Sequence, residues 1–330
     1  MAVAALRPPV LPPEFLPVVG DALLRVARIA AVLSVGVFLA NVAVALGVVE
    51  RVAGLSRYLT GPANLPDEVG TAILTTAAST TAGYGMLAEF RESGMLDDRA
   101  TLVAVTINTF FGFVQHIFTF YVPVLIPILG LKVGLLYVGA RAGIALGITV
   151  AGILGGALLL SERNVDPTKT VAAEAPDDEE RTRREVLERA WERTVPKVRR
   201  IVPRLAVIYV LVTLLVRYVD LRSATAAADP LATLVGLPGA AVPVIAVFAF
   251  DTTAGAATIA PLVGEAFTPR EAVATMLLGG IVSFAVSTFK RSIPFQYGIW
   301  GPSFGSKVIA VNTGLKVVFI AAALAVVLGT

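Results

Sequence analysis

Thr80-Thr-Ala-Gly83 and Thr252-Thr-Ala-Gly255 are identical, and each stands inside a long apolar stretch of the chain. Leu65-Pro66 precedes the first copy by 15 residues, and Leu237-Pro238 precedes the second by the same 15. The spacing predicts a tandem repeat of units of roughly 140 residues. A duplicated membrane unit is typical of transporters, because two related halves can move about a site between them.

The ends of the two units also match. Pro127, Gly130 and Lys132 are followed 175 positions later by Pro302, Gly305 and Lys307. This match predicts that residues 175 positions apart are equivalent towards the end of each unit.

The composition indicates an integral membrane protein. The mean hydropathy is +0.80, and 15% of residues are charged, against about 25% in soluble domains. Six stretches without Asp, Glu, Lys or Arg approach or exceed the roughly 20 residues that a helix needs to cross a bilayer: 29–49, 69–88, 100–131, 142–160, 230–250 and 272–289. We expect an all-α, multi-pass bundle in the cell membrane, with about 8–10 segments built from two repeats.

The same counts argue against several other classes. The chain has no cysteine and one histidine, so thiolate metal sites and cysteine nucleophiles are absent. The net charge of +3 is typical of membrane proteins and does not indicate nucleic acid. We expect no enzymatic activity and no cofactor. The lipid bilayer, a small polar solute and a coupling ion are the expected partners, and a homo-oligomer stays open.

Three regions are expected along the chain: a first membrane repeat at 1–160, a polar linker helix at 161–196 and a second repeat at 197–330. The linker is dense in Arg and Lys, which places it on the cytoplasmic side. Residues 21–28 are expected to lie at the membrane surface. Proline and glycine break the stretches 121–130 and 293–305, which predicts broken or re-entrant helices beside a polar path. Inverted and parallel repeats both stay open.

Asp251 is the sharpest candidate for a binding residue, because it is the only charge in the apolar stretch 230–263. A carboxylate at membrane depth costs about 2.5–3.5 kcal/mol and usually has a task or a partner. With Thr252 and Thr253 it would bind solute or a coupling ion, so Asp251→Asn should abolish uptake. The counterparts in the first repeat are Ser79, Thr80 and Thr81. An ion pair with Arg217, Arg291 or Lys316 is the alternative.

A second group of candidates depends on the repeat. Asn108, Gly112 and His116 share one helix face, and the residues 175 positions later are Ser283, Ser287 and Arg291. Gln115 pairs with Lys290 in the same way. Two such faces would form a polar pocket with a positive bias, suited to carboxylate, phosphate or a solute rich in acceptors. The alternative is that Lys290 and Arg291 end a helix at the membrane surface and His116 is a packing residue.

Each unit has a small-residue helix, a turn (Glu92–Arg99; Gly264–Glu271) and an apolar helix with Asn108 or Ser283. This order resembles the nucleoside-recognition, or Gate, domain in two copies. The family includes parts of concentrative nucleoside transporters, the pore of the bacterial ferrous-iron permease and the spore maturation proteins. The resemblance implies a pore-and-gate unit of broad solute range. The missing cysteine and the absence of a Gly-x-x-x-x-Gly-Lys-[Ser/Thr] motif argue against iron.

The leading hypothesis is a permease for a small polar solute, nucleoside-like or anionic, that binds between the repeats. One alternative is a permease for a hard cation, magnesium or sodium, because carboxylate and hydroxyl oxygens suit such ions. A second alternative is a protein that handles lipid phosphate. The last alternative is a membrane protein that does not transport and that recruits a soluble protein through its linker helix.

Overall fold

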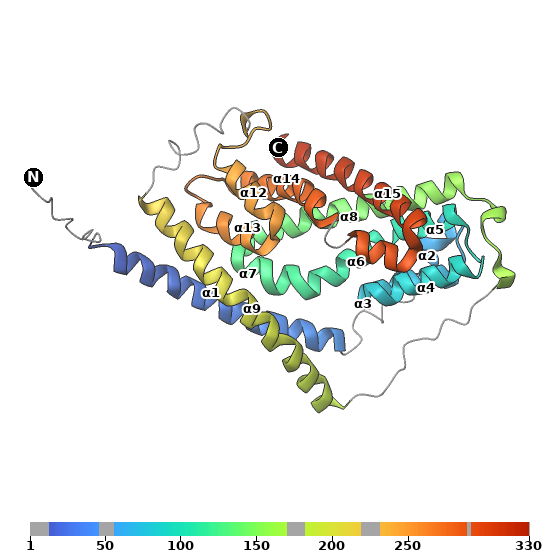
Figure 1. The fold of residues 1–330 in the computed structure, drawn as a ribbon, viewed down its shortest axis with the longest axis horizontal. Helices are drawn as coiled ribbons and strands as arrows, with labels where there is room; N and C mark the ends of the chain where they lie inside the picture. The colour runs from blue at the N-terminus through green and yellow to red at the C-terminus, as the bar shows by residue number, and fades with distance from the viewer. Residues whose placement is uncertain (1–12, 46–55, 170–181, 219–231, 289–291, 330) are drawn as a thin grey trace, which may run out of the picture.

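The computed structural model describes residues 13–45, 56–169, 182–218, 232–288 and 292–329 (Figure 1). Within these ranges the chain is helical and contains no strand, apart from isolated bridges at Leu96–Val165 and Val263–Phe267. The prediction of an all-α fold is confirmed.

The α-helices are named as in Figure 1, and the described part of the first repeat contains ten helical elements. They are α1 (Phe15–Ala45), α2 (Ser56–Thr60), η2 (Gly61–Ala63), α3 (Asp67–Ala78), α4 (Thr80–Glu92), α5 (Asp98–Ile107), α6 (Thr109–His116), the π-helix η3 (Ile117–Leu125), α7 (Ile126–Leu129) and α8 (Leu131–Leu159). Two short turns, η4 (Glu162–Asn164) and η5 (Pro167–Lys169), follow. The described elements of the second repeat are α9 (Arg183–Tyr218), α12 (Ala241–Phe250), α13 (Thr252–Ile259), η7 (Ala260–Leu262), α14 (Pro269–Ser287) and α15 (Ile293–Gly329).

The repeated Thr-Thr-Ala-Gly motif begins the second arm of a helical hairpin in each repeat. Ser79 is extended (φ −146°, ψ 108°) and its hydroxyl accepts the Ala82 N–H at 3.3 Å, which caps α4. Asp251 has nearly the same backbone (φ −150°, ψ 117°), and its carboxylate accepts the Ala254 N–H at 2.8 Å to cap α13. One extended residue with an N-capping side chain therefore separates the two arms each time.

The glycine of the motif lets the two arms touch. A methyl group on Gly83 would lie 2.6 Å from the Ala72 carbonyl oxygen on α3, and one on Gly255 would lie 2.7 Å from the Phe248 Cα on α12. In each pair the two contacting residues come from different arms, one before the break and one after it. The two arms therefore fold back on each other. The longest arm has 13 residues, or about 20 Å, which is shorter than the roughly 30 Å hydrocarbon layer.

A second shared feature is a sharp kink at a glycine. Gly130 (φ 77°, ψ 163°) separates α7 from α8, and Gly301 (φ 72°, ψ 166°) interrupts α15 in the same conformation. These positive φ angles are ones that glycine adopts without strain. The kinks are 171 positions apart, so the 175-residue pairing predicted from the sequence is wrong by one helical turn. Asn108 is therefore equivalent to Gly279, and not to Ser283.

The two repeats exchange their kinked segments. Trp300, Phe304 and Val308 of α15 belong to the core around α3, α4 and α5, whereas Leu125 and Ile128 of η3 and α7 belong to the core around α12, α13 and α14. Each repeat thus completes the core of the other. Figure 1 shows the two hairpins at opposite ends of the molecule, with α8 and α15 running between them.

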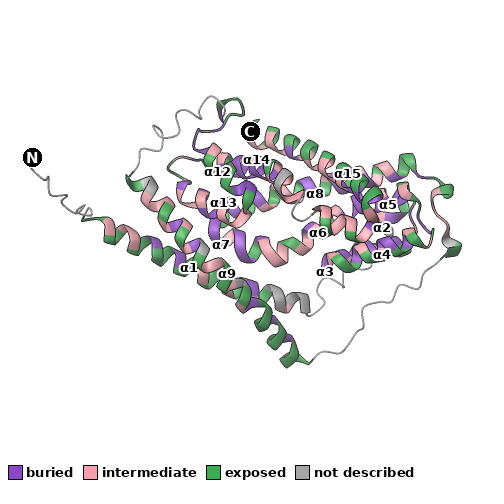
Figure 2. Cartoon of the chain, in the orientation of Figure 1, coloured by how far each residue is buried: buried purple, intermediate pink, exposed green. Residues whose placement is uncertain are grey.

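Four helical spans are long and apolar enough to cross a membrane: Phe15–Leu39, Asp98–Leu129, Leu131–Leu159 and Ile293–Gly329. Large apolar side chains are exposed on these spans, such as Leu39 on α1, Leu158 on α8 and Val326 on α15. Figure 2 shows exposed residues along α1, α8 and α15 in green. A soluble monomer rarely exposes apolar surface of this extent. These observations identify a helical protein suited to a membrane.

Two expected segments belong to longer helices. The predicted linker helix and the first helix of the second repeat form one element, α9, which continues through Pro196 and Pro203, so the boundary at residue 196 falls inside a helix. Residues 21–28, expected at the membrane surface, belong to the first part of α1. Figure 1 shows α1 and α9 crossing one face of the molecule side by side.

We predict that Gly83→Ala destabilises the protein by about 1–3 kcal/mol, because the added methyl group overpacks the contact between α3 and α4. Gly85 is the matched control on the same helix, since a methyl group there meets no atom within 4 Å. Gly85→Ala should be neutral or stabilising by up to about 1 kcal/mol, because alanine favours helix. Thermal unfolding of the detergent-solubilised variants measures both effects. Equal midpoints for the two variants would show that the hairpin arms do not touch at Gly83.

Candidate functional site

A cavity of about 300 Å³ lies between the two repeats, and we call it the central cavity. Both repeats supply its walls. The first contributes Thr80, Tyr84, Asn108, Thr109, Gly112, Phe113, His116, Tyr121, Arg141, Ile144, Ala145 and Ile148, and the second contributes Ser292, Phe295, Gln296, Ile309, Asn312, Thr313 and Lys316.

Asn108 sits at the junction of α5 and α6, where the helix is interrupted. The Thr149 hydroxyl from α8 donates to the Ile107 carbonyl at 2.8 Å and accepts the Phe110 N–H at 3.1 Å, which fixes this junction. Asn108 is 1% exposed, and neither its amide oxygen nor its amide nitrogen has a hydrogen-bond partner among the described residues. Because a buried amide without partners costs free energy, this residue indicates a binding position in the cavity wall.

Two cations line the central cavity. Arg141 comes from α8, and its Nε donates to the Tyr121 hydroxyl of η3 at 3.3 Å. Lys316 comes from the middle of α15, with its Nζ 5.7 Å from the centre of the Phe284 ring. No aspartate or glutamate is among the lining residues, and neither cation has an ion-pair partner in the described parts of the chain. The cavity therefore carries uncompensated positive charge.

The structure brings part of the predicted site together. Thr80, Asn108 and His116 line the central cavity. The side-chain oxygen of Gln115 accepts a hydrogen bond from the Thr80 hydroxyl at 2.7 Å. His116 Nδ1 lies 2.8 Å from the Gly112 carbonyl oxygen on its own helix. The wall from the first repeat thus contains the amide and imidazole groups that the sequence predicts.

Other predicted residues lie elsewhere. Asp251 and Thr253 line a separate, mainly apolar hollow between α9 and α13, beside Arg200 and Leu205. Asp251 caps α13 and has no ion pair among the described residues, so neither expected partner within the described chain, Arg217 or Lys316, pairs with it. Lys290 and Arg291 lie outside the described residues, and the remaining candidates do not line the central cavity: Ser79, Thr81, Thr252, Ser283 and Ser287.

The sequence analysis missed Arg141 and Lys316 as site residues, although their signal is present. Each is the only charged residue within at least eight positions on either side in an apolar helix. Arg141 directly precedes the charge-free stretch 142–160, and the sequence analysis names Lys316 only as a partner for Asp251. A lone cation in a membrane helix is a functional candidate by the same reasoning that was applied to Asp251.

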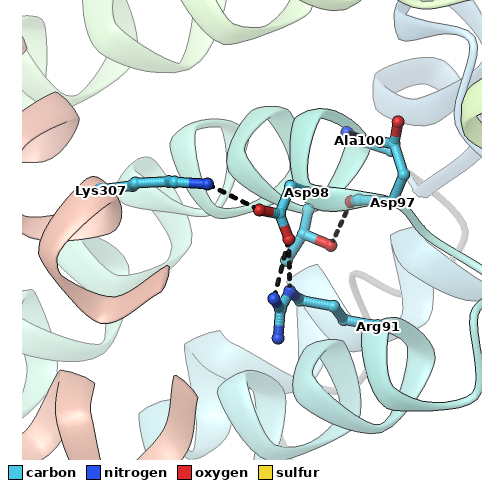
Figure 3. Close-up of polar contacts among 6 residues, drawn as sticks. Arg91, Asp97, Asp98, Ala100 and Lys307 are labelled. Atoms are coloured by element: carbon cyan, nitrogen blue, oxygen red, sulfur yellow. Dashed lines mark hydrogen bonds and ion pairs between the residues drawn. The ribbon is translucent and has the colours of Figure 1, made fainter. Parts of the chain in front are cut away.

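Ionic contacts join the repeats at one end of the molecule (Figure 3). Asp98 Oδ1 accepts from Arg91 Nε at 2.9 Å and Nη2 at 2.8 Å, and Asp98 Oδ2 accepts from Lys307 Nζ at 2.8 Å. The neighbouring Asp97 caps α5 by accepting the Ala100 N–H at 2.8 Å. We call Arg91, Asp98 and Lys307 the Asp98 cluster; it links α4 and α5 of the first repeat to α15 of the second.

The Asp98 cluster is reinforced by aromatic packing. The Arg91 guanidinium lies 4.1 Å from the centre of the Phe304 ring, and Trp300 packs between Phe304 and Tyr84. The residue equivalent to Asp98 in the second repeat is Pro269, which carries no charge. This contact between the repeats is therefore not duplicated at the other end of the molecule.

The fold and the cavity define a class of helical proteins whose apolar helices could cross a membrane and enclose a polar cavity between two repeats. Two proteins of Methanocaldococcus jannaschii are similar to this chain along most of their length. MJ0871 is 24% identical over 87% of this chain and 88% of its own length, and MJ0880 is 22% identical over 90% and 95%; both are described as uncharacterized. No protein-family model and no solved structure matches the chain.

Asp251 caps α13, a structural task that the sequence analysis did not assign to it. Asparagine caps helices about as well as aspartate, whereas alanine does not. We predict that Asp251→Asn keeps its thermal stability, and that Asp251→Ala loses about 1 kcal/mol of stability. Thermal unfolding of the two variants checks both. Equal losses of stability in Asp251→Asn and Asp251→Ala would show that the carboxylate does more than cap α13.

The Asp98 cluster should contribute modestly to stability. The Asp98 and Lys307 side chains are 42% and 54% exposed, and ion pairs of this exposure are worth up to about 1 kcal/mol. We predict a coupling free energy below about 1 kcal/mol from a double-mutant cycle with Asp98→Ala and Lys307→Ala. Arg184 and Glu188, at 87% and 59% exposed, form the control pair. A coupling well above that limit would mean that the pair is shielded from water in solution.

Proposed function

We propose that this protein is a membrane transporter that carries a small polar solute through the central cavity between its two repeats. The observation that carries the proposal is the cavity itself, because polar groups from both repeats meet there inside a bundle with an apolar exterior. A membrane protein has no structural need for such a cavity, whereas solute sites of transporters lie where two repeats meet.

The arrangement of the repeats supports alternating access. We assign three passes to each repeat, α1, α5–α7 and α8 in the first and α9, α14 and α15 in the second, plus one short hairpin. Four of the six, α1, α5–α7, α8 and α15, contain the spans that are long and apolar enough to cross a membrane. With three crossings per repeat, the second repeat begins on the side of the membrane opposite to the first. The repeats are then inverted, and either end of the cavity can open by the same movement. The resemblance to Gate-type pore units supports the same class.

A hard-cation permease is the weaker reading. Magnesium and sodium require oxygen ligands, and no acidic residue lines the central cavity among the described residues. The described chain also contains no group of three or more His, Asp or Glu that could hold a metal ion. Arg141 and Lys316, which line the cavity, would repel a cation.

Flux into proteoliposomes tests the proposal. The purified protein is reconstituted, and uptake of uridine, malate, inorganic phosphate and magnesium is compared with uptake into protein-free vesicles. We expect at least one of the first three to accumulate and magnesium not to. No accumulation of any of the four by folded protein would contradict a transport function.

Cross-linking tests whether the repeats must move. The chain has no native cysteine, so Asp98→Cys combined with Lys307→Cys can be joined by a short bifunctional thiol reagent without background. We expect the reagent to reduce uptake by the double variant to the level of protein-free vesicles, because the two repeats are then tied together at one end. Each single variant treated with the reagent is the control. Unchanged uptake in the cross-linked protein would mean that this contact stays closed during transport.

A further inference from the structure

We infer that the central cavity binds a small oxyanion, a carboxylate or a phosphate, between Arg141 of the first repeat and Lys316 of the second. The inference rests on the same cavity as the proposed function but names the charge class of its ligand. It can be tested by binding alone.

The first argument is charge. Arg141 and Lys316 both line the cavity, and no acidic residue shares that lining among the described residues. Both residues are half-buried, and holding a cation partly away from water is unfavourable unless an opposite charge or several hydrogen bonds compensate it. The Tyr121 hydroxyl gives Arg141 one hydrogen bond at 3.3 Å, and the Phe284 ring lies near Lys316. A bound anion supplies the charge that these contacts lack.

The second argument is Asn108, which lies in the same lining and is independent of charge. Both of its amide atoms are buried, and neither has a hydrogen-bond partner in the described parts of the chain. The amide nitrogen needs an acceptor and the amide oxygen needs a donor. A hydroxy acid or a protonated phosphate offers both, since each has anionic oxygens and an O–H group. A neutral apolar ligand would leave the amide unpaired and both cations uncompensated.

The third argument concerns geometry. A planar guanidinium binds the two oxygens of a carboxylate or a phosphate side by side, and an ammonium group adds a compact charge. Asn312 and Thr313 of α15 lie in the same wall and offer further donors. The volume of about 300 Å³ is at the lower end for ligand pockets, which fits a solute of a few heavy atoms and not a whole lipid.

Binding to the purified protein is measured by isothermal calorimetry with malate, inorganic phosphate, uridine and a short-chain phosphatidic acid. We expect malate or phosphate to bind and uridine not to. Binding of phosphatidic acid without binding of malate or phosphate would overturn the inference of a free small anion, because the site would then hold a lipid headgroup. Binding of uridine alone would overturn it as well.

Variants connect binding to the two cations. Arg141→Gln and Lys316→Gln should each lower the affinity for the anion by about tenfold or more. This is the loss expected for one charge-assisted hydrogen bond. Lys132→Gln is the matched control, because Lys132 is exposed on the same helix as Arg141 and loses the same charge. Arg141→Lys keeps the charge and should retain part of the affinity. These variants are compared only where gel filtration shows a monodisperse protein.

The outcomes separate this inference from the proposed function. Anion binding that depends on Arg141 and Lys316 without any flux would support the inference and contradict transport. Flux of uridine with no anion binding would support transport and overturn the inference. Anion affinity that falls equally in Lys132→Gln and Arg141→Gln would overturn it too, since the effect would then follow net charge and not the cavity.

Discussion

Backbone hydrogen bonding at the hairpin breaks is the constraint on which the rest of this structure depends. A helix that reverses inside an apolar bundle exposes N–H groups that neither lipid nor apolar side chains can satisfy. Ser79 and Asp251 meet this need with one side-chain oxygen each, and Gly83 and Gly255 let the second arm pack against the first. Each hairpin is short. The kinked segment of the other repeat packs against the second arm of that hairpin.

The exchange of kinked segments explains why a cavity exists. Trp300 and Phe304 fill the core of the first repeat, while Leu125 and Ile128 fill the core of the second. The helices that follow the kinks, α8 and α15, must then run between the hairpins, and they contact each other where the Phe319 ring packs on Gly147. The space beside this crossing is the central cavity. Its walls therefore combine both repeats as a direct result of the fold.

Much of this fold could be predicted from the sequence because it depends on local rules. The apolar stretches, the repeated motif and the broken segments follow from composition and spacing, and the structure confirms an all-α fold with broken helices. The register of the second half could not be predicted in this way. Pro127 and Pro302 match by residue type, but the equivalent kinks are defined by the backbone of Gly130 and Gly301. A comparison of residue types does not give backbone angles.

The site was predicted less well, for a physical reason that Asp251 and Arg141 illustrate. A lone charge in an apolar helix signals either a cap for the backbone or a group that faces a cavity, and the sequence does not distinguish the two. At Asp251 the carboxylate satisfies a backbone N–H. At Arg141 the side chain lies in mid-helix, where no backbone N–H is unpaired, so only a neighbouring element or a ligand can satisfy it. The position within the helix separates the two cases, and that position becomes known only when the helix boundaries are known.

The symmetry of the scaffold and the asymmetry of the charges together bear on how the proposed anion would lie in the cavity. With the kinks as reference, Arg141 is equivalent to Asn312, and Lys316 is equivalent to Ala145. Both cations therefore stand on the same face of equivalent helices, displaced by one turn of about 5.4 Å. A symmetric site would present two identical groups to its ligand. Here a planar guanidinium and a compact ammonium are offset along the crossing helices, which favours a ligand with two different ends over a symmetric one.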